Sequence, residues 1–330
     1  MDDSNRLRCL SPEEAVAVID KAQSIAIAGH INPDGDSLGS SLALLELLKA
    51  MGKDAVVLLG QDTPAPELYQ FLPNYEFIFA GEYKETPDLF IAVDSSTATR
   101  LGASERLLTV ARDTLVVDHH ANYEGYAQHY IGDEHAPATA SVIWKIIKAS
   151  GVAPTLNMAS CCYVALMTDT GRFAFRNTNH SAFADAAEMV NLGVDPAAIN
   201  EMVYANKSFE VMRLEALLVD RMQVVGTGNI AYSFLSKNDL DERGIKRDQT
   251  EELPAIIRSL KGVEVSALFR DEGDGDIRVS LRARDNYNVG EFAREFGGGG
   301  HAGAAGLTLK MPLEEAIGRV VNKLTADLLA

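Results

Sequence analysis

Short, mostly apolar runs in the first half of this chain end at acidic or histidine residues. Ser24–Ala28, Asp88–Val93 and Thr114–Val117 are each followed within two residues by a histidine or an aspartate. Runs of this length and composition predict buried strands. In an open, mostly parallel sheet, the C-terminal ends of the strands line one edge, where ligands bind. We therefore expect segments that are far apart in the sequence to meet at one crevice.

Helical patterns lie between these predicted strands. The segment Ser11-Pro-Glu-Glu14 supplies an N-cap, a proline at the first helical position and a glutamate at the third, so a helix begins there. Leucines recur at helical spacing over Leu38–Leu48, and Gly52 ends that helix. Ala140–Ala149 and Leu156–Met167 are also helical. This alternation predicts an α/β fold with helices flanking a mostly parallel sheet.

The second half of the chain predicts a smaller α/β domain. Its strands include Val263–Arg270 and Asp276–Arg284, and Val289–Phe296 is expected to be a helix. With 330 residues and 47% apolar composition, the chain is long enough to bury two cores. We expect one domain over residues 1–195, a linker helix over 196–220 and a second domain over 221–330.

Several features predict a cytoplasmic protein that does not enter a membrane. Cys9, Cys161 and Cys162 are too few and too poorly spaced for a disulfide framework, and the adjacent pair lies in an apolar helix, where we expect small core residues. The chain has no apolar run of about 18 residues, which a membrane-spanning helix requires. Its acidic N-terminus lacks the layout of a secretory signal.

The formal net charge of −17 limits the class of ligand. Proteins that hold long duplex or single-stranded nucleic acid normally offer a basic groove, because neutralising phosphates supplies most of the affinity. A chain this acidic is not expected to bind long duplexes. Any nucleic-acid substrate should be short and held by a few arginines and by metal ions. The alternative that charge alone leaves open is an ordinary acidic protein surface.

Five segments carry side chains suited to phosphate and metal chemistry. They are His30-Ile-Asn-Pro-Asp34-Gly-Asp36-Ser37, Ala92-Val-Asp94-Ser95-Ser96, Val117-Asp118-His119-His120, Met167-Thr-Asp169-Thr170-Gly171 and Gly297-Gly298-Gly299-Gly300-His301-Ala-Gly303. Any one of them could be a surface turn, and Pro-Asp-Gly-Asp alone usually is. The first three segments all follow predicted strands, which favours a common site.

The composition of these segments favours two divalent cations. A pair of ions needs several carboxylates, at least one of them bridging, with imidazoles completing the ligands. Oxygen ligands with imidazole suit Mn²⁺ best, with Mg²⁺, Co²⁺ or Fe²⁺ as alternatives, and the absence of a nearby cysteine argues against structural zinc.

Taken in order, the first four segments resemble the signature motifs of the DHH phosphoesterase superfamily, which is named after a triplet like Asp118-His119-His120. The glycine-rich stretch, with Arg282 upstream, resembles the family's DHH-associated domain. The spacing of the motifs is similar to that in the oligoribonuclease and 3′-phosphoadenosine 5′-phosphate phosphatase branch (NrnA type). The same branch is resembled in the segments Arg100-Leu-Gly102 and Asn177-Thr178. One departure is Asn288-Val289, where related chains often carry Asp-Val. The resemblance implies a metal-binding catalytic domain followed by a substrate-binding domain, with the active site in the cleft between them.

The resemblance also implies a role for each site residue. His30 and Asp34 would bind the first metal, Asp94 would bridge, and Asp118 would orient the ring of His119, with His120 facing the scissile phosphate. The ligands assigned to the second metal are Asp36, His119 and Asp169. The groups assigned to the substrate's other phosphate are Arg282, His301 and the backbone amides of Gly298, Gly299 and Gly300.

A metal-dependent phosphodiesterase follows from this resemblance. It would hydrolyse short RNA and linear dinucleotides such as pApA or pGpG to nucleoside 5′-monophosphates, and would also remove the 3′-phosphate of 3′-phosphoadenosine 5′-phosphate (pAp). Three alternatives stay open at this point: a RecJ-like exonuclease, a family II pyrophosphatase, and an inactive nucleotide sensor. The sequence leaves monomer and homodimer open, together with the metal in the cell, cleavage polarity and the preference for RNA over DNA.

Overall fold

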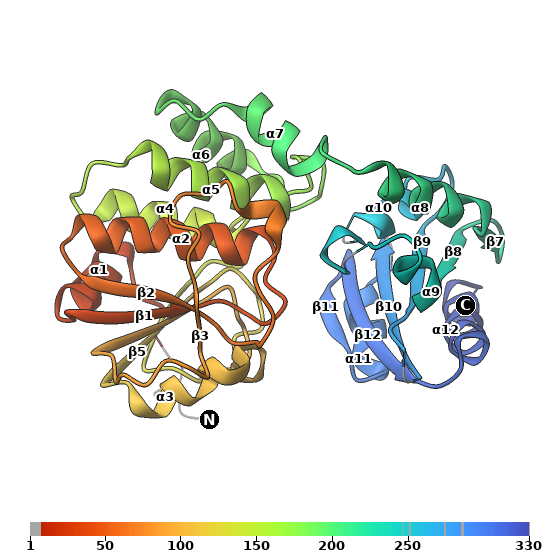
Figure 1. Cartoon of the computed structure of the whole chain (residues 1–330), viewed down its shortest axis with the longest axis horizontal. Helices are drawn as coiled ribbons and strands as arrows, with labels where there is room; N and C mark the ends of the chain where they lie inside the picture. Colours follow the sequence, from red (N-terminus) through yellow and green to blue (C-terminus); the bar gives the residue numbers. More distant parts are fainter. Residues whose placement is uncertain (1–7, 246, 251, 274, 285–286, 330) are drawn as a thin grey trace. The chain divides into compact units, whose positions relative to one another are not determined.

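The computed structural model of the chain describes residues 8–245, 247–250, 252–273, 275–284 and 287–329 (Figure 1). It divides into two compact units, Met1–Ala205 and Asn206–Ala330. Each unit contains its own sheet and its own hydrophobic core. The α/β fold expected from the alternating pattern is confirmed in both.

The first unit is built on a six-stranded sheet in the order β3-β2-β1-β4-β5-β6. All neighbouring pairs in this sheet are parallel. The strands are β1 (Ser24–Ala28), β2 (Asp54–Leu59), β3 (Ile78–Phe79), β4 (Leu89–Val93), β5 (Asp113–Asp118) and β6 (His129–Gly132). Since β1 has β2 on one side and β4 on the other, the chain reverses its direction of winding at β1 and β4. Ligands bind outside the carboxyl ends of strands at such a point.

Helices cover both faces of this sheet, and Figure 1 shows the larger layer above the strands and α3 below them. Alternate residues of β1 face opposite sides, so Ile25 and Ile27 join the larger core while Ala26 and Ala28 join the smaller one. The elements on the larger side are α1 (Pro12–Asp20), α2 (Gly35–Ala50), α4 (Thr139–Ala149), α5 (Leu156–Asp169), α6 (His180–Asn191) and α7 (Pro196–Tyr204). The smaller side carries η3 (Ala98–Arg106) and α3 (Leu107–Val110), and η2 (Glu67–Tyr69) lies between β2 and β3 in the chain. Cys161 and Cys162 are fully buried in the larger core, as expected.

The segment expected to form one linker helix is instead two helices. Helix α7 ends at Tyr204, and α8 (Phe209–Asp220) begins after Ser208, whose side chain accepts a hydrogen bond from the backbone of Val211. A serine in this position starts a new helix, because it satisfies an amide that has no partner in the helix itself. The break between Ala205 and Ser208 coincides with the boundary between the two units.

The second unit contains a mixed sheet in the order β11-β12-β10-β9-β8-β7. Only β8 and β9 among its described neighbours run parallel, and the other pairs are antiparallel. The strands are β7 (Gln223–Val225), β8 (Ile230–Leu235), β9 (Val265–Asp271), β10 (Asp276–Ala283), β11 (Gly299–His301) and β12 (Ala304–Lys310). The glycine-rich segment therefore contributes strand β11, which the sequence had not suggested.

Two helical layers enclose this second sheet. Helices α8 and α10 (Leu253–Arg258) pack on one face, and α11 (Val289–Glu295) and α12 (Leu313–Leu329) pack on the other. The short elements α9 (Lys237–Asp241) and η4 (Arg247–Thr250) connect β8 to α10. Asn288 caps α11 by accepting from the backbone of Glu291. Asparagine caps a helix about as well as aspartate, so the departure from Asp-Val leaves this helix intact. Across the described residues, no helix is both long and apolar enough to span a membrane.

Candidate metal centre

The loop after β1 places His30 beside two carboxylates. The ring Nδ1 of His30 lies 2.8 Å from the Ile31 carbonyl oxygen, which makes Nδ1 the protonated donor. Its Nε2 therefore faces inward, 3.4 Å from Asp94 Oδ2 and 3.8 Å from Asp34 Oδ2. The side chain is buried. Holding the outer ring nitrogen in this way is how proteins orient a histidine that binds metal through the other nitrogen.

Asp34 uses its two carboxylate oxygens for different purposes. Oδ1 caps α2 by accepting from the backbone amides of Asp36, at 3.1 Å, and Ser37, at 3.0 Å. Oδ2 stays directed at His30. The same residue thus begins the helix and presents a free oxygen to the site.

Asp36 caps a helix to which it does not belong. Its Oδ2 accepts from the Thr139 amide at 2.7 Å, and its Oδ1 accepts from the Ala140 amide at 3.1 Å and from Ser40 Oγ at 2.9 Å. Helix α4 has Ala138 at its N-cap, which offers no side-chain acceptor. A carboxylate at this helix N-terminus compensates for the missing cap and is favoured by the helix dipole.

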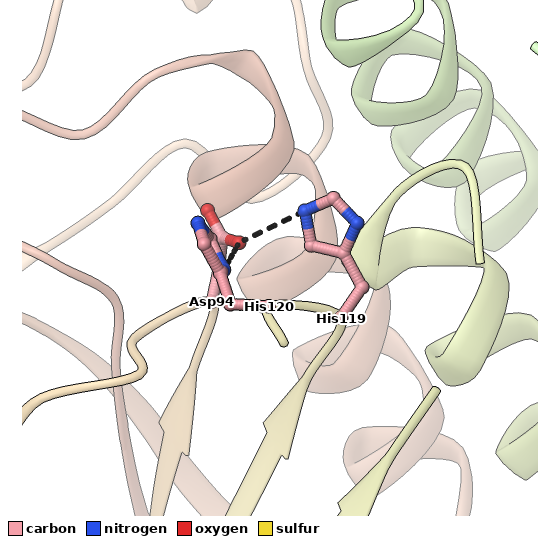
Figure 2. A group of neighbouring side chains, drawn as sticks. All are labelled: Asp94, His119 and His120. Atoms are coloured by element: carbon pink, nitrogen blue, oxygen red, sulfur yellow. Dashed lines mark ion pairs between the residues drawn. The ribbon is translucent and has the colours of Figure 1, made fainter. Parts of the chain in front are cut away.

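Asp94 occupies the centre of the cluster. Its Oδ2 faces His30, while its Oδ1 lies 3.9 Å from His119 Nε2 and 3.6 Å from His120 Nδ1 (Figure 2). Its backbone has a φ of 57°, in the left-handed region that residues with a Cβ seldom adopt. The Asp94 amide donates to the Val117 carbonyl at 2.9 Å, which holds this conformation at the end of β4. With its two oxygens turned to different histidines, Asp94 has the arrangement a bridging ligand requires.

The Asp118 side chain contacts a different ring from the one expected. Its Oδ1 lies 2.7 Å from His120 Nδ1 and also accepts from the backbone amides of His119 and His120. The Nδ1 of His119 is instead 3.1 Å from the Ala136 carbonyl oxygen. The expectation that Asp118 orients the His119 ring is therefore wrong. Because Asp118 ends β5 and the chain turns there, its carboxylate reaches the second histidine of the triplet.

Asp169 approaches the cluster from the C-terminal end of α5. Its Oδ2 lies 3.7 Å from His119 Nε2, the nitrogen that also faces Asp36 at 3.8 Å. Asn177 Nδ2 donates to the same Oδ2 at 3.0 Å and to the carbonyl oxygens of Asp169 and Pro137. Asn177 thus ties the end of α5 to the segment before α4.

The side chains form three overlapping groups. Within each group, the candidate ligand atoms lie within 4.8 Å of one another. The groups are His30, Asp34 and Asp94; Asp36, His119 and Asp169; and Asp94, His119 and His120. Asp94 and His119 each belong to two of the groups. Carboxylate oxygens and imidazole nitrogens in adjoining groups that share a carboxylate match the donors needed by a pair of divalent cations.

Burial and crowded charge shift the pKa values of this cluster strongly. Burial, followed by the charges of neighbouring aspartates, raises the pKa values of Asp36 and Asp169 well above the ordinary carboxyl value. Burial alone would lower the pKa of His30, but hydrogen bonding to Asp34 and Asp94 raises it to about 10. Burial likewise opposes protonation of His120, but Asp118 and Asp94 raise its pKa to about 9. Carboxylates confined this closely favour bound positive charge, as at many functional sites.

The residues expected to bind substrate lie in the second unit. Arg282 is on β10, paired in register with Ser266 and Ala304, and its Nη1 donates to the Leu281 carbonyl at 2.9 Å. Gly298 and Gly300 have a packing reason to be glycine, because an added Cβ would lie 2.3 Å from the Gly306 oxygen and 2.5 Å from the Ala304 oxygen, respectively. At Gly299 an added Cβ would meet nothing within 4 Å. The side chain of His301 lies outside the described residues.

Two residues that support the cluster were not singled out as site residues from the sequence. Thr139 Oγ1 donates to Asp94 Oδ1 at 2.9 Å, and Asn177 holds Asp169 as described above. The sequence carried no such signal for Thr139. With the helix predicted from Ala140, Thr139 stands at its N-cap position, where a threonine is ordinary and indicates no contact with the site.

Comparison with known proteins agrees with this geometry. Residues 24–166 match the DHH family, N-terminal domain, and residues 227–328 match the DHHA1 domain. A bifunctional oligoribonuclease and PAP phosphatase NrnA of Thermus thermophilus is 31% identical over 309 residues, which cover 92% of this chain and 90% of the relative. The protein of the same description from Bacillus subtilis is 25% identical, with 90% and 92% covered. The crystal structure of an exopolyphosphatase-related protein from Bacteroides fragilis has the same fold, with a TM-score of 0.87, 24% identity and coverage of 96% and 95%.

Proposed function

Because this chain belongs to the DHH family of phosphoesterases and carries its DHHA1 domain, we propose that it hydrolyses very short oligonucleotides to nucleoside 5′-monophosphates. It is a phosphoric ester hydrolase whose substrates would be short RNA and linear dinucleotides such as pApA and pGpG. Removal of the 3′-phosphate of pAp is a second activity, favoured by the bifunctional description of its relatives. The relatives do not favour the RecJ-like, pyrophosphatase or sensor alternatives.

The observation that carries this proposal is the position of Asp94 between two groups of metal-ligating side chains. His30 and Asp34 would hold one cation, while Asp36, His119 and Asp169 would hold the other. Mn²⁺ suits this mixture of carboxylates and imidazoles, with Mg²⁺, Co²⁺ and Fe²⁺ as alternatives. When bound, two such ions supply an activated water and offset the charge that develops on phosphorus.

The chain's own residues would complete the reaction. His120 adjoins Asp94 without belonging to the two groups assigned to the metals, and its Nδ1 is held by Asp118, so its Nε2 would face the scissile phosphate and donate to it. Arg282 and His301, together with the amides of Gly298, Gly299 and Gly300, would bind the substrate's other phosphate. Binding of a second phosphate in this way would favour short substrates over long ones. The proposed setting is the cytoplasm.

Product analysis with purified protein and Mn²⁺ tests the proposal. The substrates are 5′-phosphorylated RNAs of two, five and twenty-four residues, pAp and pyrophosphate, with His119→Ala as the inactive control. We expect mononucleotides to be released fastest from the shortest RNA, and this activity to be lost in the variant. Turnover confined to pyrophosphate or to the longest RNA would assign the protein to another branch of the family. Bound metal without turnover would favour a sensor.

A further inference from the structure

The loop between β4 and η3 is fixed by hydrogen bonds at several points. Ser95 Oγ donates to the Thr97 carbonyl at 3.0 Å, and Tyr126 donates from its hydroxyl to the Ser95 carbonyl at 2.6 Å. The Ile31 amide donates to the Arg100 carbonyl at 2.7 Å. The backbone of Arg100 is therefore tied to the residue that follows His30, on a loop that begins at Asp94.

Close packing two residues later holds Arg100 at the same edge of the sheet. Gly102 has a φ of 54°, and an added Cβ would lie 2.3 Å from the Gly60 carbonyl and 2.6 Å from the Ile31 side chain. Only glycine fits this approach without displacing the backbone. As a result, η3 is fixed against the loops that follow β1 and β2, and Arg100 lies between the His30 and Asp94 segments.

The Arg100 guanidinium has no hydrogen bond or ion pair with any residue that the structure describes, although the residue is only partly exposed. Neighbouring arginines are bonded: Arg106 donates to the carbonyl oxygens of Ala80 and Tyr83, and Arg112 pairs with Asp88 at 3.0 Å. A guanidinium offers five N–H donors, and leaving them unused at a partly buried position is unfavourable. An acceptor from outside the chain would satisfy them.

The loop that carries Arg100 borders both sides of the bridging carboxylate. His30 and His120 lie on different sides of Asp94, at 3.4 and 3.6 Å from its two oxygens. The Arg100 carbonyl is bonded to the residue after His30, and the loop itself begins at Asp94. Arg100 is thus anchored beside the segments that carry both ligand groups.

The charge balance of the site leaves a role for one more cation. Asp34, Asp36, Asp94 and Asp169 together would neutralise two divalent ions and leave no excess positive charge for an anionic substrate. A phosphodiester brings one negative charge and gains another during hydrolysis. A positively charged side chain that is already in position before the reaction begins stabilises such charge effectively.

We propose that Arg100 is a phosphate-binding residue of the catalytic unit, whose guanidinium donates to a non-bridging oxygen of the phosphodiester being hydrolysed. This assignment rests on the proposed function, because it places the reacting phosphate at the metal centre. It differs from the role given to Arg282, which would bind the substrate's other phosphate. Arginine suits the task, since its planar fork can donate two parallel hydrogen bonds to one phosphate.

The test compares Arg100→Gln and Arg100→Lys with Arg112→Gln. The last variant makes the same change of charge at the amino end of β5, away from the site, where Arg112 is exposed. Turnover is measured with pApA and with the synthetic diester bis(p-nitrophenyl) phosphate. Calorimetry measures binding of Mn²⁺ to the protein and of inorganic phosphate to the Mn²⁺-loaded protein.

We expect Arg100→Gln to lower kcat/KM by about 10²–10³-fold on both diesters, as for loss of one donor to a developing oxyanion. Arg100→Lys should recover part of this activity, because lysine keeps the positive charge but lacks the planar guanidinium that donates two parallel hydrogen bonds. Phosphate binding should weaken in Arg100→Gln, while its Mn²⁺ binding should equal that of the unaltered protein. Arg112→Gln should equal the unaltered protein in turnover and in both binding measurements. Equal activity of Arg100→Gln and Arg112→Gln, or unchanged phosphate binding, would overturn the proposal. Loss of Mn²⁺ affinity would also overturn it, since Arg100 would then act on the histidine ligands.

The two substrates separate this proposal from the proposed function. If the unaltered protein hydrolyses the synthetic diester but not pApA, the assignment of short oligonucleotides fails, and the effect of Arg100→Gln on the synthetic diester still decides the role of Arg100. If it hydrolyses neither, phosphate binding to the Mn²⁺-loaded protein decides that role without turnover.

Discussion

Thr139 and Asp94 are joined by a hydrogen bond of 2.9 Å from the threonine hydroxyl to the carboxylate Oδ1. The backbone amide of the same threonine donates to Asp36 Oδ2 at 2.7 Å. Thr139 is fully buried, as Asp36 and Asp94 nearly are. The first turn of α4 therefore positions a carboxylate from each of two ligand groups, including the one proposed to bridge the metals.

Replacing Thr139 with valine should weaken metal binding. Valine keeps the volume but removes the hydroxyl, so Asp94 Oδ1 loses the donor that fixes its orientation. Loss of an outer hydrogen-bond partner of a metal ligand usually costs about 10–100-fold in affinity. We expect a decrease of this size in Mn²⁺ affinity, measured by calorimetry, and recovery with Thr139→Ser.

Thr114→Val is the matched control for this effect. Thr114 is also buried, and its hydroxyl accepts from the Gln128 amide at 2.9 Å, but it lies at the opposite end of β5 from Asp118. The same loss of a buried hydroxyl there should leave Mn²⁺ affinity unchanged. Equal losses of affinity in both variants would mean that general destabilisation is responsible.

Mn²⁺ should raise the thermal stability of the protein. A ligand that binds only the folded state at about 100 times its Kd stabilises by about 2.7 kcal/mol. For a unit of this size that corresponds to roughly 5–10 °C in the unfolding midpoint, reversed by a chelator. His119→Ala should lose most of the increase. His129→Ala, which removes a histidine paired with Asp113 at 3.0 Å, should retain it. An equal increase in both variants would contradict the assignment of His119 as a ligand.

The sequence predicted those parts of the fold whose signal is local. Ser24–Ala28 forms a strand over the expected residues, because its apolar run is buried by both helical layers. The edge strand β3 was not predicted, since only Ile78 and Phe79 form it and neither is buried. Pairing with β2 makes β3 a strand, and a single sequence does not show such pairing.

The same distinction applies to the candidate site. The histidines and acidic residues that follow strands could be predicted to meet, since strand ends share one edge of a parallel sheet. Asp169 ends a helix, so only the family resemblance placed it in the cluster. The supporting hydrogen bonds were not predicted, because they join distant residues. Asp36 and Thr139 are separated by 103 positions. Which ring Asp118 would contact depended on the turn after β5, which the residues of the triplet do not specify.

Asp239 should make the stability of the second unit depend on pH. Burial opposes its ionisation, but hydrogen bonds from Arg221 and Ser236 lower its pKa below the ordinary value. The unfolded pKa is about 3.9, so this contribution is fully present above that pH and is lost as pH falls through the lower folded pKa. Asp239→Asn should cost about 1–3 kcal/mol at pH 7, and the difference from the unaltered protein should shrink below about pH 4.

Circular dichroism during urea unfolding would measure this loss. The fluorescence of Trp144, the only tryptophan in the chain, reports on the first unit and should be unaffected. A difference that stays constant from pH 7 to pH 3 would show that the Asp239 charge is not involved.

The backbone of Asp94 offers a separate test of how the site is built. A residue with a Cβ costs about 1–2 kcal/mol in the left-handed conformation seen at its φ of 57°, and glycine largely avoids this cost. Asp94→Gly and Asp94→Ala both remove the carboxylate, so both should abolish activity. The glycine variant should nevertheless melt roughly 2–4 °C higher than the alanine variant. At Asp118, which belongs to β5, the order should reverse, because glycine in an extended strand is less stable than alanine. A higher melting temperature for the alanine variant at both positions would show that the backbone of Asp94 is not strained.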